Sequence, residues 1–380
     1  MGLGAAGSAT AWRLAARGLT VLGLDAHAPP HDFGSSHGSL RITRKAIGEG
    51  EAYVPLVLRS NELWRELERE GVDRLIGIAG GLWISSPRRQ AEAHVANFFD
   101  NTLAAARHHG IEHELLDAAA VRKRFPQFAI RDNEMAYYEP DAGYLRPEAC
   151  VAAMLRAATR RGAEIHVNER VTAFHEDREG VAVLTDRGAY RARELVLCAG
   201  PWIRGLVEPR IAALFSVTRQ VQYWFATEGP QVAFEPPAFP VWIWELQERR
   251  NVIYGFPAVD GPAAGVKIAT EQYAHTTSPE RMARAVTDEE VREMHQNLVA
   301  PYLPGVTSRC IRAEPCLYTS TPDFHFVIDR LPGASRVSLV SACSGHGFKH
   351  APAVGEMAAD LVTGAERLPR REPFAIRRLL

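Results

Sequence analysis

The spacing of three glycines at the start of the chain constrains its fold more than any other feature. Gly2, Gly4 and Gly7 open a run of small residues that predicts a helix over residues 5–17, and a buried strand ending at Asp25 follows. In dinucleotide-binding βαβ units, such glycines let a pyrophosphate approach the N-terminus of a helix, and the acidic residue accepts a hydrogen bond from a ribose. The pattern predicts a Rossmann-like domain, although a glycine-rich turn beside a surface aspartate has the same local sequence.

The strand that should precede these glycines is not present, because only Met1 stands before Gly2. We expect either that the natural start lies several residues upstream or that the chain lacks the first strand of its sheet. A missing strand would leave a gap in the sheet and lower stability. Mass spectrometry of the native protein distinguishes the two alternatives.

Charge and cysteine usage exclude several classes of protein. The 380 residues carry a formal net charge of -1, so no charge excess indicates a nucleic acid or an acidic membrane surface as partner. The sequence contains neither an apolar run long enough to span a bilayer nor a secretory signal. Its five cysteines form no CxxC pair, which argues against a disulfide framework or a zinc site. We therefore expect a cytoplasmic protein without a metal, membrane or nucleic-acid partner.

Buried strands return in the middle and at the end of the chain. They are predicted at residues 194–198 and 336–342, and residues 217–256 between them are β-rich and aromatic. Helices are predicted over residues 53–70, 88–109, 279–302 and 345–363. This order predicts an α/β fold in which a β-rich layer is inserted into the Rossmann-like domain.

Residues suited to binding a cofactor and an anion lie near the C-terminus. Cys316 and Tyr318 supply a thiol and a phenol, and Lys349 supplies an ammonium beside a glycine-flanked helix start at residue 345. These groups can bind an aromatic cofactor together with an anionic substrate.

Three further cations have two open interpretations each. Arg41 and Arg44 belong to a glycine- and serine-rich loop over residues 34–44, which is either a binding loop or a solvated basic surface. The two arginines would be neighbours if the loop became helical. Lys267 stands in a short apolar strand, where it either extends to water or points inward with a functional role.

Together these segments resemble the family of monomeric sarcosine oxidases and N-methyltryptophan oxidases. The resemblance covers essentially the whole chain, and its motifs are Gly2-x-Gly4-x-x-Gly7-Ser8-Ala9, Gly34-Ser35-Ser36-His37-Gly38 with Arg41 and Arg44, Gly48-Glu49-Gly50, Tyr254-Gly255-Phe256-Pro257, Cys316-x-Tyr318-Thr319-x-Thr321-Pro322-Asp323 and Ser344-Gly345-His346-Gly347-Phe348-Lys349. Members are FAD enzymes that oxidise secondary amines of N-methyl amino acids with O₂. The resemblance implies a monomer of glutathione-reductase-type flavoprotein architecture. Its FAD-binding domain would comprise residues 1–82, 146–214 and 310–380, and its substrate domain residues 83–145 and 215–309.

The resemblance also implies roles for individual residues. Cys316 matches the cysteine that forms a thioether with the flavin, and Arg44 and Lys349 match the pair that holds the substrate carboxylate. Lys267 matches the lysine beside flavin N5 that assists O₂ reduction, and residues 345–348 would face the flavin pyrimidine oxygen. The remaining implied positions are Arg41, Tyr254 and Tyr318 as catalytic residues, Ile243 and Glu271 as substrate contacts, and Gly2, Gly4, Gly7, Asp25, Ser35, His37, Val171, Gly345, His346, Gly347 and Phe348 as cofactor contacts.

Some positions depart from the pattern of sarcosine oxidase. Glu271 stands where that family member has histidine, and an inward carboxylate there would favour a substrate with an additional cation or hydrogen-bond donor. The other departures are Leu40, Ile47 and the bulky pair Trp242 and Trp244 that flanks Ile243. Together they predict a substrate larger than sarcosine, either a bulkier N-methyl amino acid or a cyclic secondary amino acid.

The resulting functional hypothesis is an FAD-dependent oxidase that converts a secondary amine with a carboxylate into an imine and reduces O₂ to H₂O₂. One alternative is a flavin dehydrogenase that passes its electrons to another acceptor. A second alternative, suggested by the missing first strand, is a degenerate binding protein without flavin.

Overall fold

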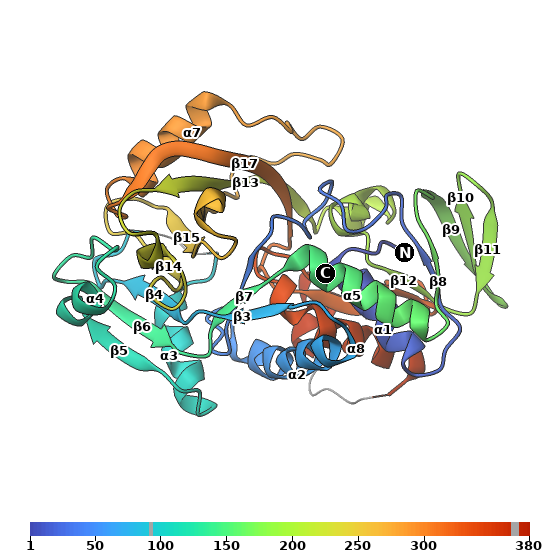
Figure 1. Ribbon diagram of the computed structural model, residues 1–380. Helices are drawn as coiled ribbons and strands as arrows, with labels where there is room; N and C mark the ends of the chain where they lie inside the picture. The colour runs from blue at the N-terminus through green and yellow to red at the C-terminus, as the bar shows by residue number, and fades with distance from the viewer. Residues whose placement is uncertain (91–93, 366–371) are drawn as a thin grey trace.

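Two lobes make up the structure (Figure 1). The computed structural model describes residues 1–90, 94–365 and 372–380. In the view of Figure 1, the right-hand lobe packs helices around short strands, and the left-hand lobe is built on one large sheet. The chain therefore has the mixed α/β fold that the sequence predicts.

Parallel strand pairs form the centre of the right-hand lobe. Strand β1 (Leu22–Leu24) pairs in parallel with β8 (Glu164–His166). Strand β12 (Leu195–Leu197) pairs in parallel with β19 (Val337–Ser341), and β18 (Val327–Arg330) adds to β19 in the antiparallel sense. Parallel pairing between strands far apart in sequence is typical of a Rossmann-like domain that is interrupted by an insertion.

The first two residues join these two strand groups. The amino group of Met1 donates to the carbonyl of Val196 at 2.9 Å, and its own carbonyl accepts from Cys198 N at 2.8 Å. On the other side, Gly2 N donates to the carbonyl of Leu24 at 2.8 Å. Met1 and Gly2 thus occupy the place between β1 and β12 where the sequence pattern requires a strand.

Four helices cover this lobe, and small residues let two of them approach closely. Helix α1 (Ala5–Ala15) packs against α5 (Pro147–Arg160) and α8 (Ala351–Thr363), and α2 (Val54–Glu70) also packs on α8. A Cβ atom on Gly355 of α8 would lie 2.5 Å from the backbone of Ala9 in α1. The small residues at the start of the chain therefore serve helix packing as well as the loop before the helix.

The left-hand lobe is an eight-stranded sheet with the strand order β17-β13-β16-β15-β14-β4-β6-β5. In this order the strands are Val306–Ser320, Ser216–Thr227, Val266–Thr270, Val252–Phe256, Val241–Glu245, Gly81–Ser85, Met135–Glu139 and Glu114–Asp117. Trp242 and Trp244 are fully buried between this sheet and helix α4 (Ala118–Arg124) and its neighbouring segments. The aromatic stretch of the sequence is thus mainly sheet core.

The remaining elements are small. One sheet contains β2 (Arg41–Thr43), β7 (Gly143–Leu145) and β3 (Ile76–Ile78), and another contains β9 (Val171–Asp177), β10 (Gly180–Thr185) and β11 (Ala189–Ala192). The other α-helices are α3 (Phe98–His108), α6 (Pro209–Ala212) and α7 (Asp288–Met294). No helix in the described ranges is both long enough and apolar enough to cross a membrane.

Three predicted helices are shorter than expected. Within residues 88–109 only α3 is helical, because Asn97 adopts a left-handed conformation before it, and residues 91–93 lie outside the described ranges. Within residues 279–302, helix α7 begins only where Thr287 caps it, and a π-helical turn follows. The predicted helix over residues 345–363 begins at Ala351 after a 3-10 turn.

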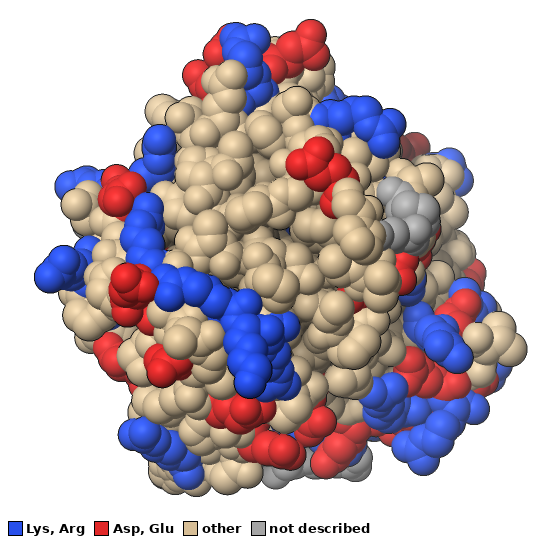
Figure 2. All heavy atoms as spheres, turned by 60° about the vertical axis from the view of Figure 1, so that its left-hand side comes forward, with Lys and Arg blue, Asp and Glu red and all other residues tan. Residues whose placement is uncertain are grey.

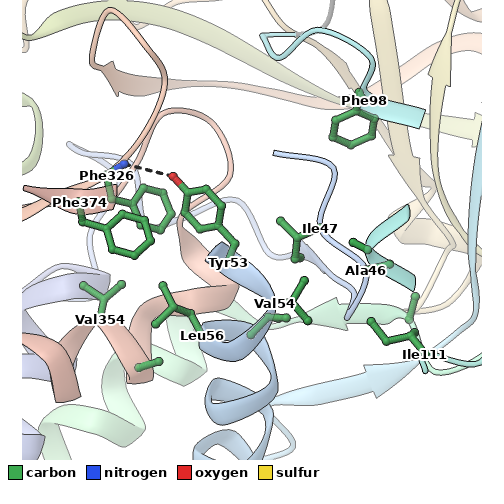
Figure 3. Packing of buried hydrophobic residues seen from close by; sticks show 14 of the residues in the cluster. Ala46, Ile47, Tyr53, Val54, Leu56, Phe98, Ile111, Phe326, Val354 and Phe374 are labelled. Carbon is green, nitrogen blue, oxygen red and sulfur yellow. Dashed lines mark hydrogen bonds between the residues drawn. The ribbon is translucent and has the colours of Figure 1, made fainter. Parts of the chain in front are cut away.

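A shared hydrophobic core fixes the two lobes to each other (Figure 3). Tyr53 at the start of α2 packs against Phe326, whose backbone N–H donates to the Tyr53 hydroxyl at 3.3 Å. The same cluster includes Ile47 and, from helix α3, Phe98. This core supports the segment between Arg44 and α2, which carries polar groups of the cavity described below.

The surface carries charges of both signs. On the face shown in Figure 2, basic and acidic side chains are interspersed around an uncharged centre. This agrees with the formal net charge of -1 for the whole chain.

Candidate active site

A cavity of about 760 Å³ lies between the two lobes and is lined by residues of both. This volume is in the upper part of the range of about 300–1,000 Å³ that is usual for cofactor and ligand sites. The predicted site residues that line it are Gly2, Gly4, Asp25, Ser35, Arg41, Arg44, Val171, Ile243, Tyr254, Lys267, Glu271, Tyr318, Gly345, His346, Gly347, Phe348 and Lys349. The predicted residues Gly7, His37 and Cys316 are not part of its lining.

One end of the cavity is formed by the glycine-rich turn before α1. The Ser36 hydroxyl accepts from the first free N–H of the helix, on Ala5, at 3.0 Å. A Cβ atom on Gly4 would lie 3.2 Å from this hydroxyl, and one on Gly7 would lie 1.7 Å from the carbonyl of Gly2. Gly7 is therefore required for the turn itself, which explains why it does not line the cavity.

Asp25 lies beside this turn. Its carboxylate accepts from the backbone N–H of Leu3 at 2.6 Å and of His27 at 2.8 Å. Burial would raise the pKa of Asp25, but the interactions with His31 and with these two N–H groups outweigh it and lower the pKa. The ionised carboxylate has about four acceptor positions, so it can accept a further hydroxyl from a ligand.

Lys267 points inward, which settles the two interpretations of its apolar strand. Its side chain is 1% exposed, and Nζ donates to the carbonyls of Gly38 and Leu40 at 2.7 Å each. Burial, reinforced by the nearby Arg41, lowers the pKa of Lys267 well below its usual value. Gly38 and Leu40 belong to the loop over residues 34–44. Glu148 holds the other side of this loop, because its carboxylate accepts from the Gly38 N–H at 2.7 Å.

Arg41 and Arg44 lie in and directly after strand β2, so the helical neighbourhood considered for them does not occur. Arg41 donates to Gln222 Oε1 at 2.9 Å and to the carbonyl of Ser35 at 3.3 Å. These contacts connect the glycine- and serine-rich loop to β13 of the large sheet. The loop therefore lies at the cavity and is not a solvated basic surface.

Arg44 and Lys349 lie together with a carboxylate of the chain itself. Glu49 Oε2 forms a very short contact with Arg44 Nη2, and Glu49 Oε1 lies 3.7 Å from Lys349 Nζ. All three side chains are nearly fully buried. Burial would raise the pKa of Glu49, but the two cations lower it far below its usual value. Burial lowers the pKa of Lys349 to about 7, although Glu49 opposes this shift.

His94 and Glu271 form a second polar pair in the cavity. His94 Nδ1 lies 3.1 Å from Glu271 Oε2, and His94 Nε2 lies 3.9 Å from Glu49 Oε1. Burial would lower the pKa of His94, but the charge and hydrogen bond of Glu271, together with the charge of Glu49, outweigh burial and raise it. The sequence does not identify His94 as a site residue, because a lone histidine within the predicted helix over residues 88–109 gives no indication of the side it faces. The short motif around Glu49 was noted without a role.

Tyr254 and Tyr318 lie next to each other in the cavity lining. The hydroxyls of Tyr254 and Tyr318 are 3.1 Å apart, and burial raises the pKa of both. Ile243 pairs with Tyr254 across β14 and β15 and also lines the cavity. Both phenols therefore stay protonated and present an apolar wall with two hydroxyl groups.

Most of the departures from the sarcosine oxidase pattern do not face this cavity. Leu40, Ile47, Trp242 and Trp244 are buried in hydrophobic cores and do not line it. Side chains alternate along a strand, so the two tryptophans point to the opposite face from Ile243. These four positions therefore give no direct support to the prediction of a substrate larger than sarcosine, and among the departures Glu271 reaches the cavity.

Near the C-terminal motif, the structure differs from two expectations, which concern the position of Cys316 and the N–H groups of residues 345–348. Cys316 is 2% exposed and lies behind the cavity wall, whereas Cys343 lines the cavity. Burial raises the pKa of the Cys316 thiol, although Arg41 and Lys267 oppose the shift. The N–H groups of His346 and Gly347 donate to the carbonyl of Cys343 at 2.9 Å each. They are therefore part of a tight turn and not the free donors of a helix start.

Comparisons with known proteins identify relatives of the whole chain. The family model of FAD-dependent oxidoreductases matches residues 1–361. A monomeric sarcosine oxidase from Streptomyces avermitilis is 43% identical over 97% of this chain and 94% of its own length. An N-methyl-L-tryptophan oxidase from Citrobacter koseri is 34% identical over 100% of this chain and 97% of its own length. The open form of NikD, an amino acid oxidase of nikkomycin biosynthesis, superimposes with a TM-score of 0.82 at 26% identity, with 98% of this chain and 95% of NikD covered.

Proposed function

The chain belongs to the family of FAD-dependent oxidoreductases, and we propose that it oxidises N-methyl amino acids with O₂ as the electron acceptor. One observation supports the proposal most strongly. The same cavity contains buried cations that suit a carboxylate and, beside them, a turn that suits a nucleotide. The two sequence relatives supply the substrate class, since both are named as oxidases of N-methyl amino acids.

The residues at the nucleotide end fit an FAD molecule. Gly4 and Ser36 form a cradle that a side chain at position 4 would fill, and Asp25 offers free acceptor positions. The Ser35 hydroxyl is buried at the cavity without a hydrogen-bond partner in the described ranges, as expected for a group that binds a ligand. We propose that these groups, with Val171 and the turn at residues 345–348, hold the cofactor.

We further propose that one lobe mainly binds FAD and the other mainly binds the substrate. The FAD-binding domain would comprise residues 1–82, 146–214 and 310–380, and the substrate domain residues 83–145 and 215–309. The boundaries at residues 82 and 310 fall within β4 and β17, two strands of the large sheet. Five unpaired cysteines support a reducing cytoplasmic location, and we propose a monomer.

The cavity walls would position the substrate. Arg44 and Lys349 would bind its carboxylate, and Tyr254, Tyr318 and Ile243 would surround the amine. An apolar wall disfavours the charged ammonium form, so it favours the neutral amine that oxidation requires. A bound FAD supplies the two-electron acceptor for the hydride that leaves the carbon next to nitrogen.

The proposed reaction balances with O₂ and water as its co-reactants. The C–H bond next to nitrogen breaks, and the nitrogen lone pair forms the C=N bond of the imine as two electrons and a proton leave. With a second proton from the nitrogen, these reduce O₂ to H₂O₂. Water then converts the imine into an aldehyde and a primary amine. Lys267 would hold a positive charge near the place where oxygen becomes negative.

The direct test is to add N-methyl amino acids to the purified yellow protein without oxygen and then to admit air. We expect the visible flavin absorbance to bleach in the first step and to return with release of peroxide in the second. Absence of bleaching with every N-methyl amino acid would overturn the proposal. Bleaching that only an artificial electron acceptor reverses would show a dehydrogenase instead.

We propose that Cys316 attaches the flavin covalently, and the structure offers a matched control. Wild-type protein precipitated with acid is expected to retain its yellow colour in the pellet. Cys316→Ala should release the colour into the supernatant, whereas Cys343→Ala should not, because Cys316 lies beside Arg41 and Lys267. If instead Cys343→Ala releases the colour, the cavity-lining cysteine is the attachment point.

The low pKa of Lys349 predicts how carboxylate binding depends on pH. A bound carboxylate favours protonated Lys349, and this form is lost as pH rises above about 7 in the free protein. Affinity for an unreactive 2-methoxy acid should therefore be greatest below pH 7 and fall up to about tenfold per pH unit above it. Calorimetry from pH 6 to 9 measures this slope. The Lys349→Met variant should bind the acid more weakly, and its affinity should not decline as the pH rises. An equal decline in this variant would show that another group causes the pH dependence.

A further inference from the structure

One polar feature of the cavity has no role in the proposed chemistry. Glu271 is the departure from the sarcosine oxidase pattern that faces the cavity, and it is paired there with His94. Neither side chain is needed to bind the substrate carboxylate, because Arg44 and Lys349 supply the cations for that task. The pair is therefore available to contact a different part of a substrate bound in this cavity.

The geometry fixes Glu271 as a hydrogen-bond acceptor. His94 Nδ1 contacts Oε2 at 3.1 Å and the Tyr273 hydroxyl is a second neighbour of the carboxylate, which can accept about four hydrogen bonds in total. The side chain of Glu271 is 14% exposed and that of His94 is 6% exposed, so the pair is largely shielded from bulk water. A buried acceptor with unused capacity discriminates strongly between ligands that carry a donor and ligands that lack one.

The charges around the pair favour a neutral donor over a cation. Arg44 lies close enough to lower the pKa of His94, and Lys349 lies close enough for Glu271 to raise the pKa of Lys349. Glu49 already balances one of these cations. A cationic substrate side chain would therefore meet the positive charge that Glu49 leaves unbalanced, whereas a neutral N–H group would meet only the acceptor.

The walls next to the pair are apolar and aromatic. Phe98, Tyr254 and Ile243 line the cavity together with His94 and Glu271. Aromatic walls with one polar acceptor suit a flat ring that carries an N–H group at its edge.

We propose that Glu271, oriented by His94, selects N-methyl amino acids whose side chain ends in a neutral ring N–H donor, and disfavours sarcosine. This inference rests on the proposed function and adds the substrate class to it. Glu271 is in this proposal a specificity-determining contact, and His94 is a positioning residue.

Two substrates that differ in one donor test the proposal. N-methyltryptophan carries an indole N–H, and its benzothiophene analogue has sulfur at that position with nearly the same shape. We expect kcat/KM of the wild-type enzyme to be about ten- to a hundredfold higher for N-methyltryptophan, as is usual for a hydrogen bond to a charged acceptor. The corresponding 2-methoxy acids, which lack the amine, should show the same preference in binding by calorimetry.

Three variants locate the source of this preference. Glu271→Leu should abolish it by removing the acceptor, and Glu271→Gln should retain part of it because the amide oxygen still accepts. His94→Phe should reduce it by leaving the carboxylate unoriented. Glu164→Gln is the matched control, since Glu164 contacts His166 at 2.6 Å in another histidine–glutamate pair that lies outside the cavity lining, and it should change nothing. Flavin absorbance of each variant checks that it folds and binds its cofactor.

The outcomes separate this inference from the proposed function. A wild-type preference below about twofold, or an unchanged preference in Glu271→Leu, would overturn the role of Glu271. If no N-methyl amino acid bleaches the flavin while the 2-methoxy acids still show the Glu271-dependent preference, the proposed reaction fails and the recognition site stands. A preference for N-methyllysine over N-methyltryptophan would show that the site takes a cation and would contradict the neutral-donor proposal.

Discussion

Arg44→Ala is expected to weaken substrate binding by about two to three orders of magnitude. The guanidinium is nearly fully buried, and its planar group can bind a carboxylate through two parallel hydrogen bonds. Alanine removes this donor from a site where water has little access to replace it. Calorimetry with an unreactive 2-methoxy acid measures the loss without interference from turnover.

The same substitution should also destabilise the protein, because Arg44 is the closest partner of Glu49. A buried carboxylate left without its partner costs about 3–5 kcal/mol, and we expect the lower end because Lys349 remains 3.7 Å away. Thermal unfolding measures this second effect. The double variant Arg44→Ala with Glu49→Gln should recover much of the stability but not the affinity.

Arg13→Ala is the matched control for Arg44→Ala. Arg13 is also a largely buried arginine, paired with Glu356 at 2.8 Å, but it lies between helices and outside the cavity lining. Its loss should lower stability without changing affinity for the carboxylate. An unchanged affinity in Arg44→Ala would remove this residue from the proposed carboxylate site.

Glu49 also shows why the sequence could predict this part of the site only incompletely. Arg44 and Lys349 are far apart in the chain, and the resemblance to a known family identified both as partners of an external carboxylate. Their shared internal partner depends on the conformation of the segment before α2, which the core around Tyr53 and Ile47 fixes. No local pattern in the sequence reports that conformation.

The lobes were predictable for a simpler reason. Glycine spacing and strand periodicity depend on backbone geometry, so they indicated the Rossmann-like part and the β-rich insertion before the structure was known. Helix limits were less predictable, because α7 begins at the cap on Thr287 and α3 begins after the left-handed Asn97. Each of these limits depends on one residue within a segment that has uniform helical propensity.

Side-chain direction was the hardest feature to predict. Trp242, Ile243 and Trp244 are consecutive, yet only Ile243 lines the cavity. Alternation along a strand predicts that the two tryptophans share a face, but not which face meets the cavity. His94 and Glu271 meet across a sequence separation of 177 residues, which only the packing of the lobes brings about.

Lys267→Met is expected to slow the return of flavin absorbance in air by about 10²–10³-fold, with a much smaller effect on anaerobic bleaching by substrate. The Lys267 side chain is buried at the cavity, where two carbonyls hold its nitrogen and its protonated form stabilises the negative charge that develops on oxygen. The neutral methionine retains the volume and removes the charge. Stopped-flow absorbance measures the two steps separately, and equal effects on both would contradict a specific role with O₂.

Loss of order in the loop over residues 34–44 is an alternative explanation for a slow Lys267→Met enzyme, and a second variant in contact with this loop tests it. Methionine leaves the carbonyls of Gly38 and Leu40 without their donor, so unfolding should become easier by about 1–3 kcal/mol for each carbonyl. Glu148→Gln loosens this loop from its other side, because Glu148 accepts from the N–H of Gly38, but it leaves Lys267 in place. If loss of loop order were the cause, Glu148→Gln would slow the reaction with O₂ as well. If the charge of Lys267 is the cause, Glu148→Gln lowers the unfolding temperature while the return of absorbance in air stays fast.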